Sequence, residues 1–432
     1  MRIYLRLPAV LVALAAVASL GGCSKGDDNA DARSRLLNVS SGYQSLDLYV
    51  NEDDSDTDSI KASAIAFAGL SEYNSVDSGT YDIKFKRAGV SSTLLTLSDK
   101  KLADDSNVTY VAFGAVGRFG VLELGEDVEE PDDNGRTKLQ ALNVSEAGAV
   151  DIYLTESDVP LEDASPLYAN VTAAGGMLTT DSGDFRLRVT GANDINDLRL
   201  DIPSITLNSK KVATLILSET RSGMLVDALL LPQQGSLTQF VNTKARVRAA
   251  VGISSGSMAS LRVGGVSIIN GQGRGVISAY SQVEAGDAAV TLVVDGAQVP
   301  VGNQALVAGG DYTVLLWSDS TGTRASLIAD DNHVPTSAAD TKIRLLNGLS
   351  TQGVPLTLYV NFFPYAEATQ LGTASAYSDV DSGTDFQVDV YNAITATALL
   401  SREADLQASG VYTLLVFGKA DGTVDSTLRK DR

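Results

Sequence analysis

A short acidic run is the first place in this sequence where residue types and spacing suggest chemistry. Asp54, Asp56 and Asp58 stand at alternate positions, the spacing at which the carboxylates of a calcium loop converge on one ion. However, Ser59 stands where the EF-hand pattern has a glycine, and Ile65 where it has a bidentate glutamate. We therefore expect a solvated loop between two strands, with a weak calcium site as the alternative.

Residues suited to catalysis are sparse. His333 is the only histidine, and it lies close to Pro335 in an expected linker, which does not hold a nucleophile and an acid rigidly around it. With one histidine and one cysteine in the chain, we expect no transition-metal centre. The 53 acidic residues make some carboxylate pair inevitable, so a hydrolase built from loop carboxylates is the least favoured alternative. We expect a protein that is not an enzyme and has no cofactor, with calcium as the one exception left open.

The amino-terminal residues have the pattern of an export signal. Arg2 and Arg6 precede a short apolar run at 7–20, which is too short to span a bilayer, and Gly22 precedes Cys23, the only cysteine. This Leu-Gly-Gly-Cys ending resembles a bacterial lipobox. The resemblance implies a signal peptide at 1–22, cleavage between Gly22 and Cys23, and acylation of Cys23.

Acylation would anchor the protein to a membrane without spanning it, because each buried CH₂ of an acyl chain contributes about 0.8 kcal/mol. Ser24 stands where an aspartate typically signals retention in the inner membrane, so we expect delivery to the outer membrane. Which face of that membrane carries the protein is left open. Residues 23–33 are expected to form a polar tether.

The charge balance limits the partners of the chain. Its formal net charge is −20, which repels the phosphates of nucleic acids, so we expect no nucleic-acid partner. The hydrophobic content of 44% is typical of folded protein. The expected partners are the membrane through acylated Cys23, and an envelope protein or a glycan.

Four similar turns organise the rest of the chain. Each has a glycine after a small or acidic pair, and the glycines recur at intervals of roughly 100 residues, the size of a small domain and too long for a solenoid unit. Glycine permits the positive φ that tight turns often need, so we interpret each as the turn of a central hairpin. The turn glycines are Gly79, Gly183, Gly286 and Gly383. A large side chain stands six positions before each of them and is expected to cap a core: Tyr73, Met177, Tyr280 and Tyr377.

Short strands surround each turn. A unit opens with an apolar strand such as 35–40, continues with a strand of alternating apolar and polar residues such as 46–50, and closes with a strand pair that begins at stretches such as 109–113. Trp317 lies in such an apolar strand and is expected in the core instead of serving as a sugar-binding platform. This pattern predicts an all-β protein of four tandem immunoglobulin-like β-sandwich domains.

Composition marks the boundaries between the repeats. The segment 126–135 is strongly acidic and is expected to be a self-repelling linker, and 232–243 and 330–340 are expected to separate the other repeats. The expected object is therefore a string of four separate domains. We place repeat 1 at 34–125, repeat 2 at 137–231, a divergent repeat 3 at 244–329 and repeat 4 at 341–432.

The repeats share a longer pattern. A first strand ends in asparagine near a serine, as at 36–40; an apolar-Asp-apolar-Tyr-Val strand follows, as at 46–50; and Tyr73 precedes the Gly-Thr-Tyr at 79–81. This pattern resembles DUF4397, a domain of unknown function found in exported and surface-attached bacterial proteins. Units two and four carry most of it, whereas unit three departs, with Arg262 in place of the strand tyrosine. The resemblance implies an immunoglobulin-like sandwich and brings no catalytic residues.

These observations favour a non-enzymatic, lipid-anchored protein of the cell envelope that acts as a multi-domain spacer or as a binding or adhesion stalk. The alternative is a carbohydrate- or calcium-binding module of the envelope.

Overall fold

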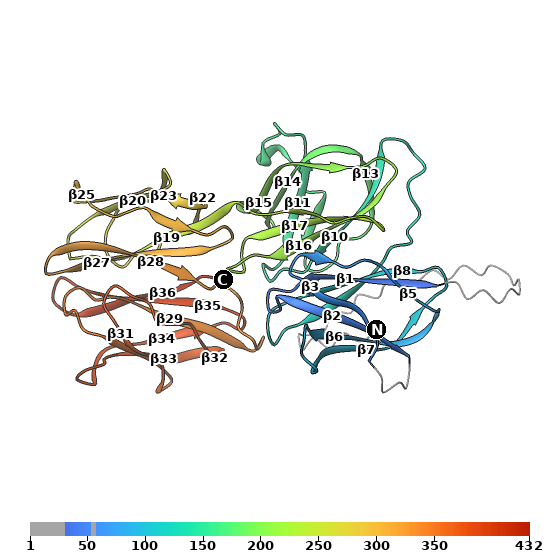
Figure 1. Cartoon of the computed structure of the whole chain (residues 1–432). Coiled ribbons are helices and arrows are strands. Elements are labelled where there is room, and N and C mark those ends of the chain that lie inside the picture. The colour runs from blue at the N-terminus through green and yellow to red at the C-terminus, as the bar shows by residue number, and fades with distance from the viewer. Residues whose placement is uncertain (1–30, 53–57) are drawn as a thin grey trace, which may run out of the picture. The chain divides into compact units, whose positions relative to one another are not determined.

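The computed structural model describes residues 31–52 and 58–432. Within them, every regular element is a β-strand except one short 3₁₀ helix, Leu161–Asp163. The chain forms two compact units, each described separately below (Figure 1): unit 1 comprises Met1–Ser218 and Ala228–Phe240, and unit 2 comprises Glu219–Asp227 and Val241–Arg432. The predicted all-β class with tandem β-sandwiches is confirmed.

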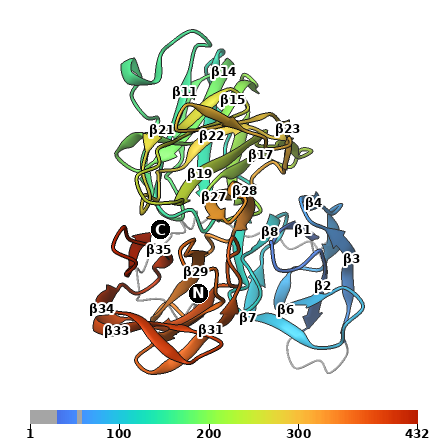
Figure 2. The same cartoon turned by 90° about the vertical axis from the view of Figure 1, so that its left-hand side faces the viewer.

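Unit 1 contains sandwiches 1 and 2, each made of two sheets. The first-strand sheet of sandwich 1 contains β1 (Ala32–Val39), β4 (Gly69–Leu70), β5 (Asn74–Val76), β8 (Asn107–Phe113) and β9 (Gly120–Gly125). Its second-strand sheet has the order β3-β2-β6-β7 (Figure 2), with bounds β2 (Ser45–Glu52), β3 (Ile60–Ala66), β6 (Gly79–Arg87) and β7 (Thr93–Leu102).

The first-strand sheet of sandwich 2 contains β10 (Arg136–Asn143), β13 (Leu178–Asp181), β16 (Val212–Glu219), β17 (Val226–Pro232) and β18 (Thr238–Phe240). Its second-strand sheet contains β11 (Val150–Thr155), β12 (Tyr168–Val171), β14 (Gly183–Gly191) and β15 (Asp194–Leu207).

Unit 2 contains sandwiches 3 and 4, built in the same way. The first-strand sheet of sandwich 3 contains β19 (Lys244–Gly252), β22 (Ser281–Glu284), β27 (Asp311–Asp319) and β28 (Gly322–Asp330). Its second-strand sheet contains β20 (Ala259–Val263), β21 (Val266–Gln272), β24 (Val290–Val294) and β25 (Ala297–Val299), and a two-stranded sheet adds β23 (Gly286–Ala288) and β26 (Gln304–Leu306).

The first-strand sheet of sandwich 4 contains β29 (Asp340–Gly348), β32 (Ser378–Asp381), β35 (Val411–Gly418) and β36 (Val424–Lys430). Its second-strand sheet contains β30 (Leu356–Val360), β31 (Phe363–Thr369), β33 (Gly383–Asn392) and β34 (Thr397–Leu406).

One strand pairing recurs in all four sandwiches and fixes the correspondence between them. The first strand lies parallel to a strand near the end of the repeat, and that strand pairs in turn with the next strand along the chain, as β8 does with β9. The register places a long polar side chain opposite a threonine each time: Arg35 opposite Thr109, Gln140 opposite Thr214, Arg248 opposite Thr313 and Arg344 opposite Thr413.

The recurrent glycine turn is a change of sheet, so the predicted central hairpin is wrong. β5 pairs with β1 in one sheet, whereas β6 pairs with β2 in the other, and only Asp77 and Ser78 connect them. Gly183 and Gly286 make this change with φ of 144° and 114°, a region open mainly to glycine. Gly79 has no such φ; instead, a Cβ there would come within 3.2 Å of the Tyr81 ring.

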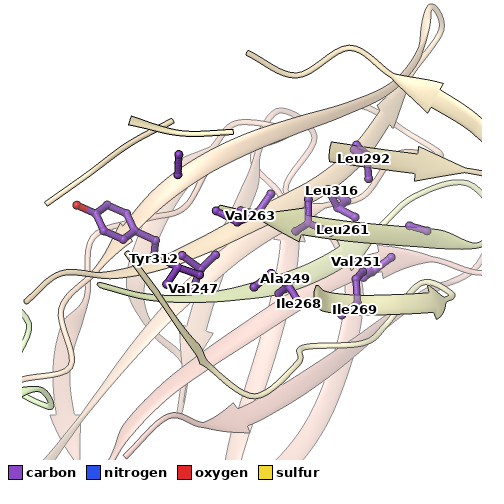
Figure 3. Packing of buried hydrophobic residues seen from close by; sticks show 14 of the residues in the cluster. Val247, Ala249, Val251, Leu261, Val263, Ile268, Ile269, Leu292, Tyr312 and Leu316 are labelled. Atoms are coloured by element: carbon purple, nitrogen blue, oxygen red, sulfur yellow. The ribbon is translucent and has the colours of Figure 1, made fainter. Parts of the chain in front are cut away.

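The core of each sandwich lies between its two sheets. In sandwich 3, alternate residues of β19 and β20 point at one another, as Val247, Ala249 and Leu261 show (Figure 3). Because side chains of a strand alternate between its faces, this core uses only one face of β19.

The other face of each first strand packs against a second sandwich. In unit 2, Ala250 of β19 and Leu346 of β29 share one cluster with Leu315 and Leu415, so the first-strand sheets of sandwiches 3 and 4 face each other (Figure 1). In unit 1, Leu37 and Val39 of β1 cluster with Leu142, Val144 and Ile216 of sandwich 2. Each first strand is therefore buried on both faces, which is why its apolar residues run continuously.

The predicted string of four separate domains is wrong, because the segments expected to be linkers are partly built into the pairs. Glu126 is only 2% exposed and bonds with Arg35, and Asn332 is fully buried. Val128 N–H donates to Gln233 Oε1 at 2.9 Å, which joins two segments expected to be open. The predicted tether to residue 33 is also too long, since β1 begins at Ala32.

Neighbouring leucines of β29 test the double burial. Leu345 points into the core of sandwich 4 and Leu346 into the interface with sandwich 3, and both are 0% exposed. We expect Leu345→Ala and Leu346→Ala each to lower the free energy of unfolding by about 2–5 kcal/mol in urea titrations. A loss at Leu346 within about 0.5 kcal/mol, the size typical of surface positions, would show that the sandwiches are not packed together.

Candidate functional site

The proposed calcium ligands lie largely outside the described residues, as do Gly22 and Cys23. Of the three aspartates only Asp58 is described; Asp54 and Asp56 are not. The Asp58 carboxylate accepts hydrogen bonds from Lys86 Nζ, from Asn51 Nδ2 at 2.9 Å and from Lys84 Nζ at 3.2 Å. The bonds from Lys86 and Asn51 lower the pKa of Asp58 to about 2. Within the described part of the chain, no three His, Cys, Asp or Glu side chains are grouped as metal ligands would be. A calcium ion at Asp58 would have to displace two ammonium groups.

His333 lies among charged side chains of unit 2. Its Nδ1 is 2.6 Å from Asp331 Oδ1, and its Nε2 is 4.0 Å from Glu219 Oε2. Asp331 also bonds with Lys342 Nζ at 2.8 Å. The segment expected to be a linker thus holds its histidine beside the ion pair of Asp331 and Lys342.

The strongest concentration of buried charge lies between sandwiches 3 and 4. The side chains of Arg248 and Arg344 are 0% and 1% exposed, and their acidic partners Asp431 and Asp330 are fully buried. Arg248 Nη2 lies 2.9 Å from Asp431 Oδ2, and Arg344 Nη2 lies 2.6 Å from Asp330 Oδ1. The arginine of each sandwich therefore pairs with the acid of the other.

Two threonines complete this crossed network. Arg248 donates from Nε to Thr313 Oγ1 at 2.9 Å and from Nη2 to Thr413 Oγ1 at 3.1 Å. Arg344 makes the reciprocal hydrogen bonds: its Nε donates to Thr413 Oγ1 at 3.1 Å, and its Nη2 donates to Thr313 Oγ1 at 3.3 Å. Each threonine hydroxyl in turn donates to the acid of its own sandwich. The arrangement has approximate twofold symmetry, because each contact from one sandwich has a counterpart from the other.

The tyrosines six positions before the turn glycines stack on these arginines. The ring centroids of Tyr280 and Tyr377 lie 4.6 Å from the Cζ atoms of Arg248 and Arg344, respectively. The ring centroid of Tyr73 lies 4.3 Å from the Cζ atom of Arg35. Such cation–π contacts strengthen when they are withdrawn from water. The three tyrosines that we expected to cap a core thus stack on buried arginines instead, whereas Met177, the fourth large side chain, is exposed.

Unit 1 has half of this network. Arg35 pairs with Glu126 of its own sandwich at 2.7 Å and donates to Thr109 Oγ1 at 2.8 Å. Sandwich 2 has Gln140 where the arginine would stand and Leu231 where the acid would stand. Without an acid from sandwich 2, Arg35 turns to its own glutamate, and its Nη1 donates to the Gly235 carbonyl at 2.8 Å.

The residues of this network recur at similar spacings in the sequence. A threonine follows the arginine by 74, 65 or 69 residues in sandwiches 1, 3 and 4. An acid then follows the threonine by 17, 17 or 18 residues. These similar spacings are the feature of the sequence from which the network could have been predicted.

The network favours the ionised form of Asp330. Burial alone would raise the pKa of Asp330, but the charges of Arg344 and Arg248 outweigh it, so this pKa lies below its usual value. Burial would also lower the pKa of Arg344, yet Asp330 keeps it raised. Paired charges of this kind join two protein surfaces. The arginine N–H groups donate to the carboxylates and threonines of the network, and the carboxylate oxygens accept from them.

The motif residues of the family-like pattern hold backbone groups. Asn38 Nδ2 donates to the carbonyls of Tyr43 and Ile65, and its Oδ1 accepts from Ser40 N–H at 3.0 Å. The buried Asp47 accepts from the N–H of Ala64 at 2.7 Å. These polar residues therefore close loops within the sandwich.

Comparison with solved structures gives only distant similarities. A family 26 carbohydrate-binding module of Eubacterium rectale Amy13K, solved with maltoheptaose, is 13% identical and covers 48% of this chain and 96% of its own, with a TM-score of 0.16. A putative cell adhesion protein of Parabacteroides distasonis is 9% identical and covers 69% of this chain and 99% of its own, with a TM-score of 0.16. The Bacillus anthracis TIE protein is 9% identical and covers 92% of this chain and 76% of its own, with a TM-score of 0.15. None of the curated proteins matches this chain.

Removing one member of the crossed network should be costly. Arg248→Met leaves Asp431 buried without its charged partner, which costs about 3–5 kcal/mol of unfolding free energy in comparable cases. The matched control is Arg324→Met, at an ion pair with Asp319 whose arginine side chain is 51% exposed, where the loss should be about 0–1 kcal/mol. Equal, small losses in both variants, measured by urea unfolding, would contradict a role for the network in joining the sandwiches.

The lowered pKa of Asp330 predicts the direction of pH dependence. The pKa of an unfolded aspartate is about 3.9, and the folded value lies lower. The stabilisation from ionised Asp330 is therefore present above about pH 4 and is lost as the pH falls toward the folded pKa. Urea unfolding followed through Trp317 should show weaker stability below pH 4. This acid dependence should be shallower in Asp330→Asn; an unchanged slope would contradict the prediction.

A family model supports the resemblance noted in the sequence. The family described as "Domain of unknown function (DUF4397)" matches residues 32–153, which span sandwich 1 and the first two strands of sandwich 2. The loop-closing Asn38 and Asp47 lie in this match. The predicted resemblance to DUF4397 is thus confirmed for residues 32–153.

Proposed function

We propose that the protein is a non-enzymatic spacer or binding stalk of the cell envelope, held at a membrane through acylated Cys23. The observation that carries this proposal is the use of buried charge. In unit 2 the buried side chains of Arg248, Arg344, Asp330 and Asp431 bind one another across two sandwiches. Residues of this kind are concentrated at a reactive centre in many enzymes, whereas here they join domains.

Joining domains in pairs suits a spacer. Sandwiches connected by flexible linkers move independently, whereas a pair that shares a hydrophobic cluster and a charge network moves as one body. Leu346 and Leu415 provide the cluster, and the crossed arginines provide the fixed alignment. The two sandwiches of unit 2 therefore act as one stiff element.

The location rests on the sequence. Within residues 31–52 and 58–432 there is no helix of the length and apolarity needed to cross a bilayer. The lipobox-like Leu-Gly-Gly-Cys supports an anchor at Cys23, and Ser24 supports delivery to the outer membrane. The acidic charge of −20 disfavours close contact with anionic headgroups, which is consistent with sandwiches that stand off from the lipid surface.

Replacing Cys23 tests the anchor. Cys23→Ala removes the sulfur that would carry an acyl chain, so we expect the protein to move from the membrane fraction to the soluble fraction of fractionated cells. Cys23→Ser is the matched conservative variant and should behave in the same way. Retention of both variants in the membrane fraction at the level of the unchanged protein would contradict lipid anchoring.

Protease treatment of intact cells tests the stalk. An outward-facing binding stalk should be cleaved on intact cells, and a periplasmic spacer only after lysis, with antibodies to each unit as the readout. The lysed sample controls for cleavability. A protein recovered in the cytosolic fraction and protected until the inner membrane is opened would contradict an envelope function.

A further inference from the structure

A groove of about 710 Å³ lies in unit 2 where sandwiches 3 and 4 meet. One wall is the edge strand β28, at residues 326–329, and the other is the segment 372–377 that leads into β32. Arg344 and Tyr377 of the crossed network also line it. The groove therefore exposes one side of the interface that the network closes.

The twofold-related position is closed by two side chains of β36. Thr427 Oγ1 donates to the Gly275 carbonyl at 2.5 Å, and Arg429 Nη1 donates to the Ile277 carbonyl at 2.7 Å. A guanidinium and a hydroxyl from the edge strand of sandwich 4 thus cover the backbone of sandwich 3.

The two positions are equivalent residue by residue. Arg429 stands opposite Thr413 and Ile328 opposite Thr313, so Ile328 takes the place of the arginine. By the same spacing, Ser326 takes the place of Thr427, but Ser326 Oγ accepts the indole N–H of Trp317 at 3.0 Å. The groove is open because Ile328 and Ser326 of β28 are shorter than Arg429 and Thr427, which close the twofold-related position. We call that closed position the twin of the groove.

The backbone of the groove has the same acceptors as its twin. Ala374 forms an isolated bridge with Leu346, as Ile277 does with Ala250. Asn347 N–H bonds with Thr373 O at 3.0 Å, and Ser375 N–H bonds with Leu345 O at 2.9 Å. This pattern makes Ala374 a non-hydrogen-bonded residue of the pair, so its own carbonyl points away from β29, toward the position where its twin meets Arg429.

We propose that this groove binds an arginine side chain presented by an extended segment of a partner protein. The twin shows which chemistry these carbonyls accept, namely a guanidinium with a hydroxyl two residues before it. Charged donors make stronger hydrogen bonds than neutral ones, and the net charge of −20 favours a basic partner. The proposal goes beyond the spacer function and does not depend on where in the cell the protein is located.

A short peptide tests the proposal on the full chain. The probe is acetyl-Ser-Thr-Leu-Arg-Lys-amide, which copies β36 at 426–430, and the control peptide has isoleucine in place of arginine. Trp317, the only tryptophan, packs against Gly372 of the groove wall, so its fluorescence reports binding. We expect saturable binding of the probe and at least tenfold weaker binding of the control peptide.

Two variants separate groove binding from other association. Ile328→Arg copies the twin and should fill the groove from within, which weakens probe binding at least tenfold. Thr427→Ser combined with Arg429→Ile copies β28 and should open a second groove, which raises the calorimetric stoichiometry from one peptide to two. Thermal unfolding verifies that both variants are folded. Equal binding of the two peptides, or an unchanged stoichiometry in the second variant, would overturn the proposal.

Discussion

The crossed pairing of Arg248 with Asp431 and of Arg344 with Asp330 is the constraint on which unit 2 depends. Each charge is buried, so none can be left without its partner at an acceptable cost. The closest acidic partner of each arginine belongs to the other sandwich, whereas the ion pair of Arg248 with Asp330 inside sandwich 3 is longer, at 3.7 Å. The charges are therefore fully paired only when the two sandwiches are together. Hydrophobic packing through Leu346 and Leu415 supplies attraction, and the arginines fix the alignment.

Unit 1 shows how the same framework tolerates the loss of half its charges. Sandwich 2 has Gln140 and Leu231 at the positions of the arginine and the acid, and Arg35 then pairs with Glu126 of its own sandwich. The apolar cluster around Leu37 and Leu142 remains. Pairing of sandwiches is therefore common to both units, whereas the crossed charge network belongs to unit 2.

The sequence predicted the strands well, because alternation and turns are local signals, but it failed to predict the pairing. The continuous apolar run at Leu345 and Leu346 indicates a strand buried on both faces, yet a run of this length is also compatible with one buried face. Thr413 lies 69 residues after Arg344, so the sequence did not identify it as a partner. The parallel register of the two strands places it opposite Arg344. The groove could not be predicted either, since it depends on comparing Ile328 with Arg429 across two sheets.

Native-state hydrogen exchange of the Arg344→Met variant, with the unchanged protein beside it, tests most directly whether the sandwiches of unit 2 stabilise each other. The substitution lies in sandwich 4, so protection of β29 should fall in either case. The account predicts that β19 and β27 of sandwich 3 lose protection by a similar free energy, because Asp330 loses its partner. Unchanged protection of β19 and β27 would contradict it and would show that the sandwiches unfold independently.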